Sequence, residues 1–136
     1  MILSQQIVHR DIRAENILIT DHETAKIANF KASRAITDST TNQSATPECV
    51  RYCAPENLVS RSQRSKYDIK SEVFSFGILL WEIAEEKVPY EKYGDDIIAI
   101  TELVCTQKYR EPFSFASPLP KDYQEIAHRG INLSKI

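Results

Sequence analysis

The sequence contains little glycine, and this limits how it could bind a nucleotide. Only three of its 136 residues are glycine, and they lie far apart, at Gly77, Gly94 and Gly130. A phosphate-binding loop of the G-x-G-x-x-G or G-x-x-x-x-G-K type needs clustered glycines, because its backbone must approach the phosphates closely. The chain therefore has no loop of either type.

Other absences exclude further classes of protein. The three cysteines form no paired framework, which is typical of a reducing compartment, and Cys49 and Cys53 lack the C-x-x-C spacing of a zinc site. A net charge of −2 gives no general affinity for nucleic acid. The most apolar stretch, residues 73–84, is too short to span a bilayer, and the N-terminus lacks a signal-peptide pattern. We therefore expect a cytoplasmic globular protein with no membrane span and no nucleic-acid partner.

Short β-branched runs in the first third of the chain predict strands. They lie at residues 7–8, 16–20 and 25–28, and the polar turn at residues 21–23 makes the last two a hairpin. Residues 33–50 are rich in Ser, Thr, Asn and Asp with little periodicity, so we expect a loop there.

The remainder of the chain predicts helices over residues 54–61, 70–86, 95–108 and 122–131. Ser71 is the expected N-cap of the second helix, whose centre has almost no polar residue and is therefore expected to be buried on all sides. In the third helix, Ile97, Ile98 and Ile100 are expected to face inward. The predicted fold class is α+β, mainly helical with one small hairpin.

Four short motifs follow one another in a specific order. They are HRDIRAEN at residues 9–16, ANF at 28–30, APE at 54–56 and SEVFSFG at 71–77. Together they resemble the C-terminal lobe of a protein kinase, with Glu72 in the place of an aspartate. Within that superfamily, the chain resembles most the tyrosine-kinase-like group, which includes the mixed-lineage-kinase-domain-like pseudokinases. The resemblance implies that residues 1–136 are a partial kinase domain, from the catalytic loop to about helix H, with the N-lobe absent.

The resemblance also implies a role for each residue of the catalytic loop. Asp11 corresponds to the catalytic base, and Asn16 to a ligand of the second Mg²⁺. Arg13 corresponds to a phosphate contact, Arg10 pairs with a phosphorylated residue of the activation loop, and His9 is structural. ATP and Mg²⁺ are the cofactors that these roles imply in an intact relative.

Several positions depart from the family's pattern. Asn29 stands where an aspartate ligates the Mg²⁺ that bridges the phosphates, and an amide offers that cation only a dipole. A loss of about 4 kcal/mol of transition-state stabilisation slows a reaction roughly a thousandfold. Lys31 replaces a conformationally free glycine, and Cys49 stands where a threonine is common. Because no N-lobe motif precedes Met1, we expect this chain alone not to bind Mg²⁺-ATP.

Three hypotheses follow from the motifs and their departures. The first is a pseudokinase that acts as a signalling or interaction module through protein partners. The alternative is a fragment of an active ATP-dependent protein kinase with a protein substrate, and the third is a truncated gene product. The sequence leaves open Ser/Thr versus Tyr preference, the partner, the oligomeric state and the phosphosite among Thr37, Ser39, Thr40 and Thr41. Glu56 is expected to pair with an arginine that would lie beyond Ile136.

Overall fold

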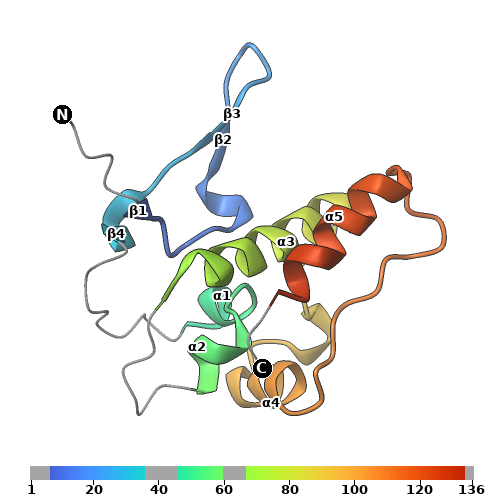
Figure 1. The fold of residues 1–136 in the computed structure, drawn as a ribbon. Helices are drawn as coiled ribbons and strands as arrows, with labels where there is room; N and C mark the ends of the chain where they lie inside the picture. Colours follow the sequence, from blue (N-terminus) through green and yellow to red (C-terminus); the bar gives the residue numbers. More distant parts are fainter. Residues whose placement is uncertain (1–6, 36–45, 60–66, 134–136) are drawn as a thin grey trace.

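A computed structural model describes residues 7–35, 46–59 and 67–133, and its first described part contains the strands (Figure 1). The strands are β1 (Ile7–Val8), β2 (Ile17–Ile19), β3 (Ala25–Ile27) and β4 (Arg34–Ala35). The helices are α1 (Pro47–Val50), α2 (Pro55–Val59), α3 (Ile69–Glu85), α4 (Ile97–Cys105) and α5 (Lys121–Ile131). Single 3₁₀ turns are η1 (Ala14–Asn16), η2 (Phe30–Ala32) and η4 (Glu91–Tyr93). The predicted α+β class is confirmed.

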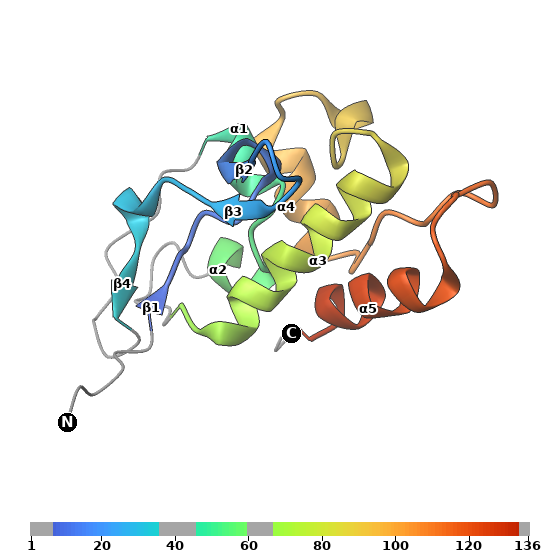
Figure 2. The same ribbon diagram turned by 90° about the horizontal axis from the view of Figure 1, so that it is seen from above.

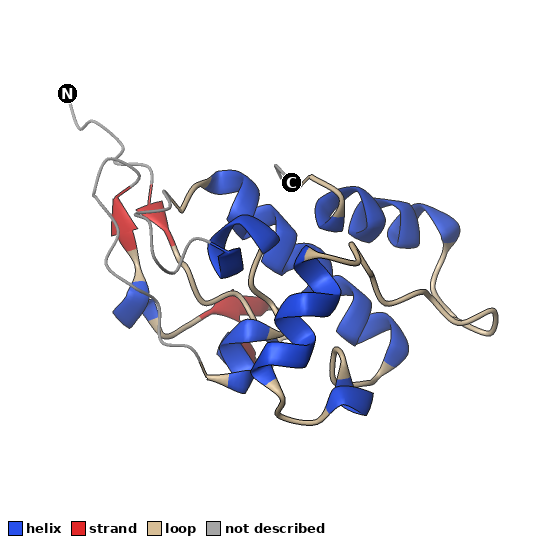
Figure 3. Cartoon of the chain, turned by 90° about the horizontal axis from the view of Figure 1, so that it is seen from below, coloured by secondary structure: helices blue, strands red, loops and turns tan. Residues whose placement is uncertain are grey.

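The predicted hairpin is present, and a second strand pair accompanies it. β2 and β3 are antiparallel, with Ile17 opposite Ile27. β1 pairs with β4, so that Val8 lies opposite Arg34. Figure 3 shows one strand pair at the edge of the molecule near the N-terminus and the other closer to the helices.

The prediction of a loop over residues 33–50 is wrong at both ends. Its first residues form β4, which the sequence pattern missed because two residues carry no periodicity. Its last residues form α1, where the Thr46 hydroxyl accepts a hydrogen bond from the Cys49 backbone N–H at 3.4 Å and Pro47 occupies the first turn. The four phosphosite candidates lie in residues 36–45, outside the described residues.

Helix α3 is the long central helix of the molecule, and its N-cap is Asp68 rather than Ser71. The Asp68 carboxylate accepts a hydrogen bond from the Ser71 backbone N–H at 3.1 Å, so the predicted cap residue is the donor and not the cap. The helix ends where Glu86 takes a left-handed conformation with φ of 52°.

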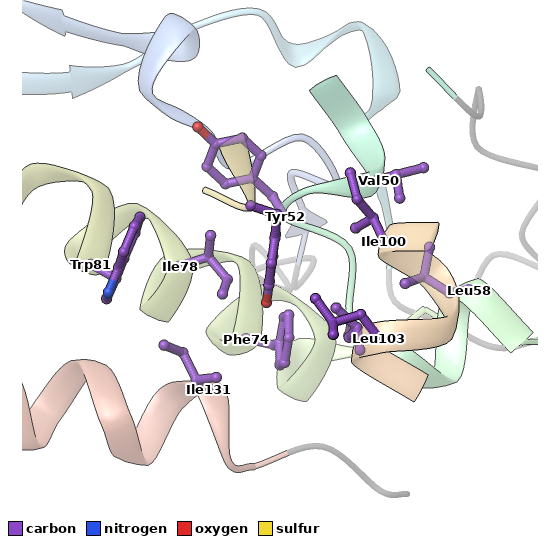
Figure 4. Packing of buried hydrophobic residues seen from close by; sticks show 12 residues of the cluster. Val50, Tyr52, Leu58, Phe74, Ile78, Trp81, Ile100, Leu103 and Ile131 are labelled. Carbon is purple, nitrogen blue, oxygen red and sulfur yellow. The ribbon is translucent and has the colours of Figure 1, made fainter. Parts of the chain in front are cut away.

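The hydrophobic core lies between α3 and the other helices (Figure 4). Phe74, Ile78 and Trp81 extend from α3 toward the side chains of the shorter helices. The partners that complete the cluster include Val50, Tyr52, Leu58, Ile100, Leu103 and Ile131. Each α-helix of the described residues therefore contributes to one core.

Two of the three glycines allow α3 and α5 to approach each other closely. A Cβ added at Gly77 would lie 2.9 Å from the Ala127 carbonyl oxygen and 2.9 Å from the Ile131 backbone nitrogen. One added at Gly130 would lie 3.1 Å from the Val73 carbonyl oxygen. The two helices run side by side in Figure 2, and at Gly77 a Cβ would force backbone atoms of α5 to shift.

Two predictions about burial are wrong. α3 is not buried on all sides, because Phe76 and Ile83 on one face are 47% and 53% exposed. In α4, Ile98 is 80% exposed although it was expected to face inward. Burial depends on which elements pack against a face, and apolarity alone does not reveal this.

Within the parts of the chain that the structure describes, no helix is both long enough and apolar enough to span a membrane.

Candidate functional site

A single carboxylate on α3 holds the loop that follows β1. The backbone N–H groups of His9 and Arg10 donate hydrogen bonds to the Glu72 carboxylate, at distances of 2.8 to 2.9 Å. Arg10 has a φ of 71°, so this backbone turns away from a strand ladder and needs another acceptor for its N–H groups. Sequence reasoning missed this role of Glu72, although its place in the SEVFSFG motif was a signal for it.

His9 connects this loop to the loop that contains Asn29. Its Nε2 lies 2.8 Å from the Ala28 carbonyl oxygen, which can only accept, so Nε2 carries the proton. Its Nδ1 accepts a hydrogen bond from the Asp11 backbone N–H at 3.3 Å. The imidazole also meets the Phe30 ring edge-on, with centroids 4.8 Å apart. These contacts fit the structural role expected for His9.

The Asp11 carboxylate lies between a cation and an amide. Its Oδ1 is 3.1 Å from Arg13 Nε, and Arg13 Nη1 is 2.9 Å from Glu15 Oε2. The Asp11 side chain is 17% exposed, so its charge is close to the surface yet paired. Arg13, the expected phosphate contact, therefore pairs with two carboxylates in this structure.

Asn16 is buried, and its amide has a defined orientation. Its Nδ2 donates to the Asp11 carbonyl oxygen at 2.7 Å and to Asp11 Oδ2 at 2.9 Å. Both partners can only accept hydrogen bonds, so the nitrogen must face Asp11 and Oδ1 must face the other way. Oδ1 is then available to a donor or a cation on the far side.

Asn29 supplies that donor. Its Nδ2 lies 3.1 Å from Asn16 Oδ1, and the Ala28 backbone N–H donates to the Asn16 carbonyl oxygen at 2.8 Å. Asn29 has φ of 64° and ψ of 63°, a left-handed conformation that asparagine tolerates better than most residues. The hydrogen bonds therefore run from Asn29 through Asn16 to Asp11, and the structure brings all three sequence-predicted residues together.

Lys31 is compatible with the conformation of its loop. It lies in η2, which follows the left-handed Asn29 and is a right-handed turn open to any L-residue. Its side chain is exposed, and its carbonyl oxygen accepts a hydrogen bond from Arg34 at 3.3 Å. The missing glycine therefore imposes no backbone strain on this form of the loop.

The residues around Asn16 do not fit a divalent cation. Mg²⁺ takes oxygen ligands, usually including a carboxylate, but an amide N–H of Asn29 already points at the Asn16 oxygen. Over residues 7–35, 46–59 and 67–133, no group of three or more His, Cys, Asp or Glu side chains is arranged to hold a metal ion. The side-chain amides of Asn16 and Asn29 hydrogen-bond to each other without a cation between them.

Arg10 and Glu56 are the other charged groups that the motifs identify. Arg10 is 6% exposed and lies over the Tyr67 ring at 5.6 Å, and burial lowers its pKa from the ordinary value. Its pairing with a phosphorylated residue stays a prediction, since the expected loop is outside the described residues. Glu56 Oε1 accepts from the Ser71 hydroxyl at 3.3 Å, while its buried Oε2 has no hydrogen-bond partner among the described residues.

Comparison with known proteins identifies relatives of this site and fold. The family described as "Protein tyrosine and serine/threonine kinase" matches residues 1–121. The mouse mixed lineage kinase domain-like protein is 38% identical over 111 residues, which are 79% of this chain and 23% of that protein. The Drosophila melanogaster dual specificity mitogen-activated protein kinase kinase hemipterous is 32% identical over 114 residues, 81% of this chain and 9% of that protein. The chain thus spans less than a quarter of the length of these relatives.

Proposed function

The chain belongs to the protein tyrosine and serine/threonine kinase family, and we propose that it forms the C-lobe part of a pseudokinase. In this proposal residues 1–136 are a partial kinase domain that acts as a signalling or interaction module. Kinases of this family use ATP and Mg²⁺. The residues at the corresponding position of this chain do not fit the cation, so no step of the proposed function uses it.

One observation carries the proposal, namely the hydrogen bond from Asn29 Nδ2 to Asn16 Oδ1 at 3.1 Å. With an aspartate at position 29, two oxygen acceptors would face each other at this distance and would need a cation between them. With asparagine, the same two positions attract each other directly. The loop can therefore keep its folded shape without the ion that catalysis requires.

The charge of the site supports the same conclusion. Replacing aspartate by asparagine removes a full negative charge from the atoms that would neutralise the cation. If this costs about 4 kcal/mol in the transition state, turnover falls roughly a thousandfold. Such a rate is of little use to a phosphotransferase but is irrelevant to a binding module.

One observation favours the alternative, an active ATP-dependent kinase of reduced rate. Asp11 keeps a partly exposed carboxylate, oriented by Asn16 at 2.9 Å and by Arg13 at 3.1 Å. A general base must be exposed to its substrate and held in position, and Asp11 meets both conditions. In either function, Asp11 would keep the base position, Arg13 the phosphate contact and Arg10 the pairing with the activation loop.

The test compares the unaltered protein with Asn29→Asp, in the full-length protein that contains this segment. Mg²⁺ and Mg²⁺-ATP binding are measured by calorimetry and thermal shift, and phosphotransfer by radiolabel incorporation. We expect the unaltered protein to show no Mg²⁺-dependent shift and Asn29→Asp to gain one, because the new carboxylate faces the Asn16 oxygen.

Two variants interpret the result. Asn132→Asp introduces the same charge at an exposed residue of the α5 C-terminus, and it should gain no Mg²⁺ response. Asp11→Asn removes the base position. Phosphotransfer by the unaltered protein that disappears in Asp11→Asn would contradict the pseudokinase and support the alternative.

A further inference from the structure

One lysine ammonium on the surface of the helical part lies over two tyrosine rings. Lys92 Nζ is 4.9 Å from the centroid of the Tyr93 ring and 5.2 Å from the centroid of the Tyr109 ring. A cation within about 6 Å of a ring centroid is attracted to the face of that ring, so both rings attract this ammonium. Lys92 and Tyr93 belong to η4, whereas Tyr109 follows α4. The contact therefore joins two separate segments of the chain.

Both rings are anchored by the hydrophobic core. Tyr93 and Tyr109 are partly buried and pack against the core cluster. The Tyr93 backbone N–H donates a hydrogen bond to the Tyr90 carbonyl oxygen at 3.0 Å, and the Tyr109 backbone N–H donates one to the Leu103 carbonyl oxygen at 3.1 Å. A site formed by groups that are already held in place loses little conformational entropy when a ligand binds.

A carboxylate adds negative charge to the same place. Glu111 Oε2 accepts a hydrogen bond from the Tyr109 hydroxyl at 3.2 Å. A hydrogen bond to the Tyr93 side chain raises the pKa of Lys92, desolvation opposes this rise, and electrostatic interactions with Tyr109 and Glu111 add to it. Two ring faces and a carboxylate together favour a cation over a neutral group.

Lys92 shows which kind of cation fits these groups and why another can replace it. Its side chain is exposed, so the ammonium contacts water as well as the rings. An unmodified lysine ammonium is strongly hydrated, and this hydration opposes its contact with an aromatic face. A trimethylammonium group carries the same charge on a larger and less hydrated surface, so it gains more from the two rings.

We propose that Tyr93, Tyr109 and Glu111 form a binding site for a trimethylated lysine of a partner protein, and that Lys92 occupies this site when no partner is bound. The occupant is a lysine side chain because Lys92 already places a four-carbon chain and its ammonium against both rings. All three residues lie outside the catalytic segment, residues 7–35. The site therefore goes beyond the proposed pseudokinase function and does not rest on it.

Removing Lys92 tests the site while both rings remain. Tetramethylammonium is titrated into the full-length protein that contains this segment, and binding is followed by saturation-transfer difference NMR of the ligand methyl signal. Lys92→Ala should bind tetramethylammonium about fivefold more tightly than the unaltered protein, because the competing ammonium is gone. Lys87→Ala removes the charge of another exposed lysine and should leave the affinity unchanged. Equal affinities in Lys92→Ala and the unaltered protein, or the same gain in Lys87→Ala, would overturn the proposal.

Variants of Tyr109 and Glu111 test the groups that bind the cation. In the Lys92→Ala background, Tyr109→Phe keeps the aromatic face and should keep the affinity, whereas Tyr109→Leu should lower it about fivefold. Because Tyr109 is partly buried, thermal unfolding establishes that each variant is folded. Glu111→Gln keeps both rings but removes the charge, so it should also weaken binding, and it decides the question if Tyr109→Leu does not fold. Unchanged affinity in Glu111→Gln and in a folded Tyr109→Leu would show that the cation binds elsewhere.

A pair of peptides tests the assigned source of the cation. They share one sequence with a central lysine, which is unmodified in one peptide and trimethylated in the other, and fluorescence anisotropy measures their binding to Lys92→Ala. We expect the trimethylated peptide to bind about fivefold more tightly than the unmodified peptide. Equal affinities would contradict the preference for a methylated lysine. Phosphatidylcholine vesicles present the same trimethylammonium group on a lipid, and cosedimentation with them without binding of the trimethylated peptide would contradict a protein partner.

Discussion

The two halves of the molecule are held together by different forces. The helical half, residues 46–59 and 67–133, contains every member of the hydrophobic core cluster. The catalytic segment, residues 7–35, contributes none of them: Val8 and Ile12 are buried outside that cluster, and hydrogen bonds to Glu72 and among its own polar groups hold the segment. Several of its large apolar side chains are instead exposed, among them Leu18, Ile19 and Phe30 at 56%, 67% and 60%.

This difference separates the residues that stabilise the fold from those that form the candidate site. Protein interiors are closely packed, so substitutions in the core of the helical half are expected to cost stability. The polar contacts of the catalytic segment involve few residues, and the hydrogen bond between Asn29 and Asn16 joins two of them outside the core cluster. A substitution in the core is therefore expected to change stability more than one in the site.

The largest expected effect is at the contact between the two long helices. Gly77→Ala adds a Cβ that would lie 2.9 Å from backbone atoms of Ala127 and Ile131. Alanine favours a helix by about 1 kcal/mol over glycine, but the clash involves backbone on both sides and cannot be relieved by a rotamer change. We expect the free energy of unfolding to fall by about 3 kcal/mol in urea denaturation.

Gly130→Ala is the matched comparison. Its closest approach is 3.1 Å, to the Val73 carbonyl oxygen, so the neighbour needs to move by only a few tenths of an ångström. It should lose less stability than Gly77→Ala. Equal losses, or no loss at Gly77, would show that α3 and α5 are not pressed together at the glycines.

A smaller and more local effect is expected where the two halves meet. Glu72→Gln keeps the size of the side chain but replaces one acceptor oxygen by a donor that faces the His9 and Arg10 N–H groups. Hydrogen bonds to a charged acceptor contribute about 1.5–3 kcal/mol, so the loop loses about 2 kcal/mol. Hydrogen exchange should accelerate at the amides of residues 9–16, while the protection of α3 and α5 stays unchanged.

Glu72→Asp is the control for charge. It keeps the carboxylate but shortens the side chain by one methylene group, so most of the protection at residues 9–16 should remain. If hydrogen exchange in Glu72→Gln accelerates equally in the catalytic segment and in the helical half, Glu72 does not hold the catalytic segment independently of the helices.

The sequence predicts the helices and strands better than it predicts their caps and which of their faces are buried. The hairpin of β2 and β3 and the helices α3 to α5 follow from local residue patterns, and α2 follows from Pro55 and Glu56 in its first turn. The predicted helix over residues 95–108 is too long at both ends, since α4 spans Ile97–Cys105. The sequence predicts Ser71 as the N-cap, whereas Asp68 is the cap; both residue types cap helices well, and only the hydrogen bond decides between them. The exposure of Phe76 and Ile98 depends on what covers each helix, and no local pattern contains that information.

The same distinction applies to the site. Order and spacing of the motifs predict that Asp11, Asn16 and Asn29 belong together, and the structure brings them into one hydrogen-bonded chain. The direction of those hydrogen bonds was not predictable, because it follows from Asp11 presenting only acceptors to Asn16. The role of Glu72 likewise depends on a contact between residues that are far apart in sequence.

The smallest expected effect is a pH dependence inside the helical half. Glu82 on α3 accepts a hydrogen bond from the Tyr52 hydroxyl. Burial raises the pKa of Glu82 above its ordinary value of 4.5, and the nearby Glu15 raises it further, while the Tyr52 hydrogen bond opposes this rise. The native state therefore holds the Glu82 proton more tightly than the unfolded state does.

The sign of the effect on stability follows from this difference in proton binding. As the pH rises from about 4.5 through the raised pKa of Glu82, the native state binds more protons than the unfolded state, so stability falls. Glu82→Gln removes this titration but keeps an acceptor for Tyr52. Its stability relative to the unaltered protein should therefore increase over that range in urea denaturation and then level off. Tyr52→Phe removes the hydrogen bond that favours the charged Glu82 carboxylate, so the pH interval over which stability falls should extend to higher pH. Parallel pH profiles of stability for Glu82→Gln and the unaltered protein would rule out Glu82 as the titrating group.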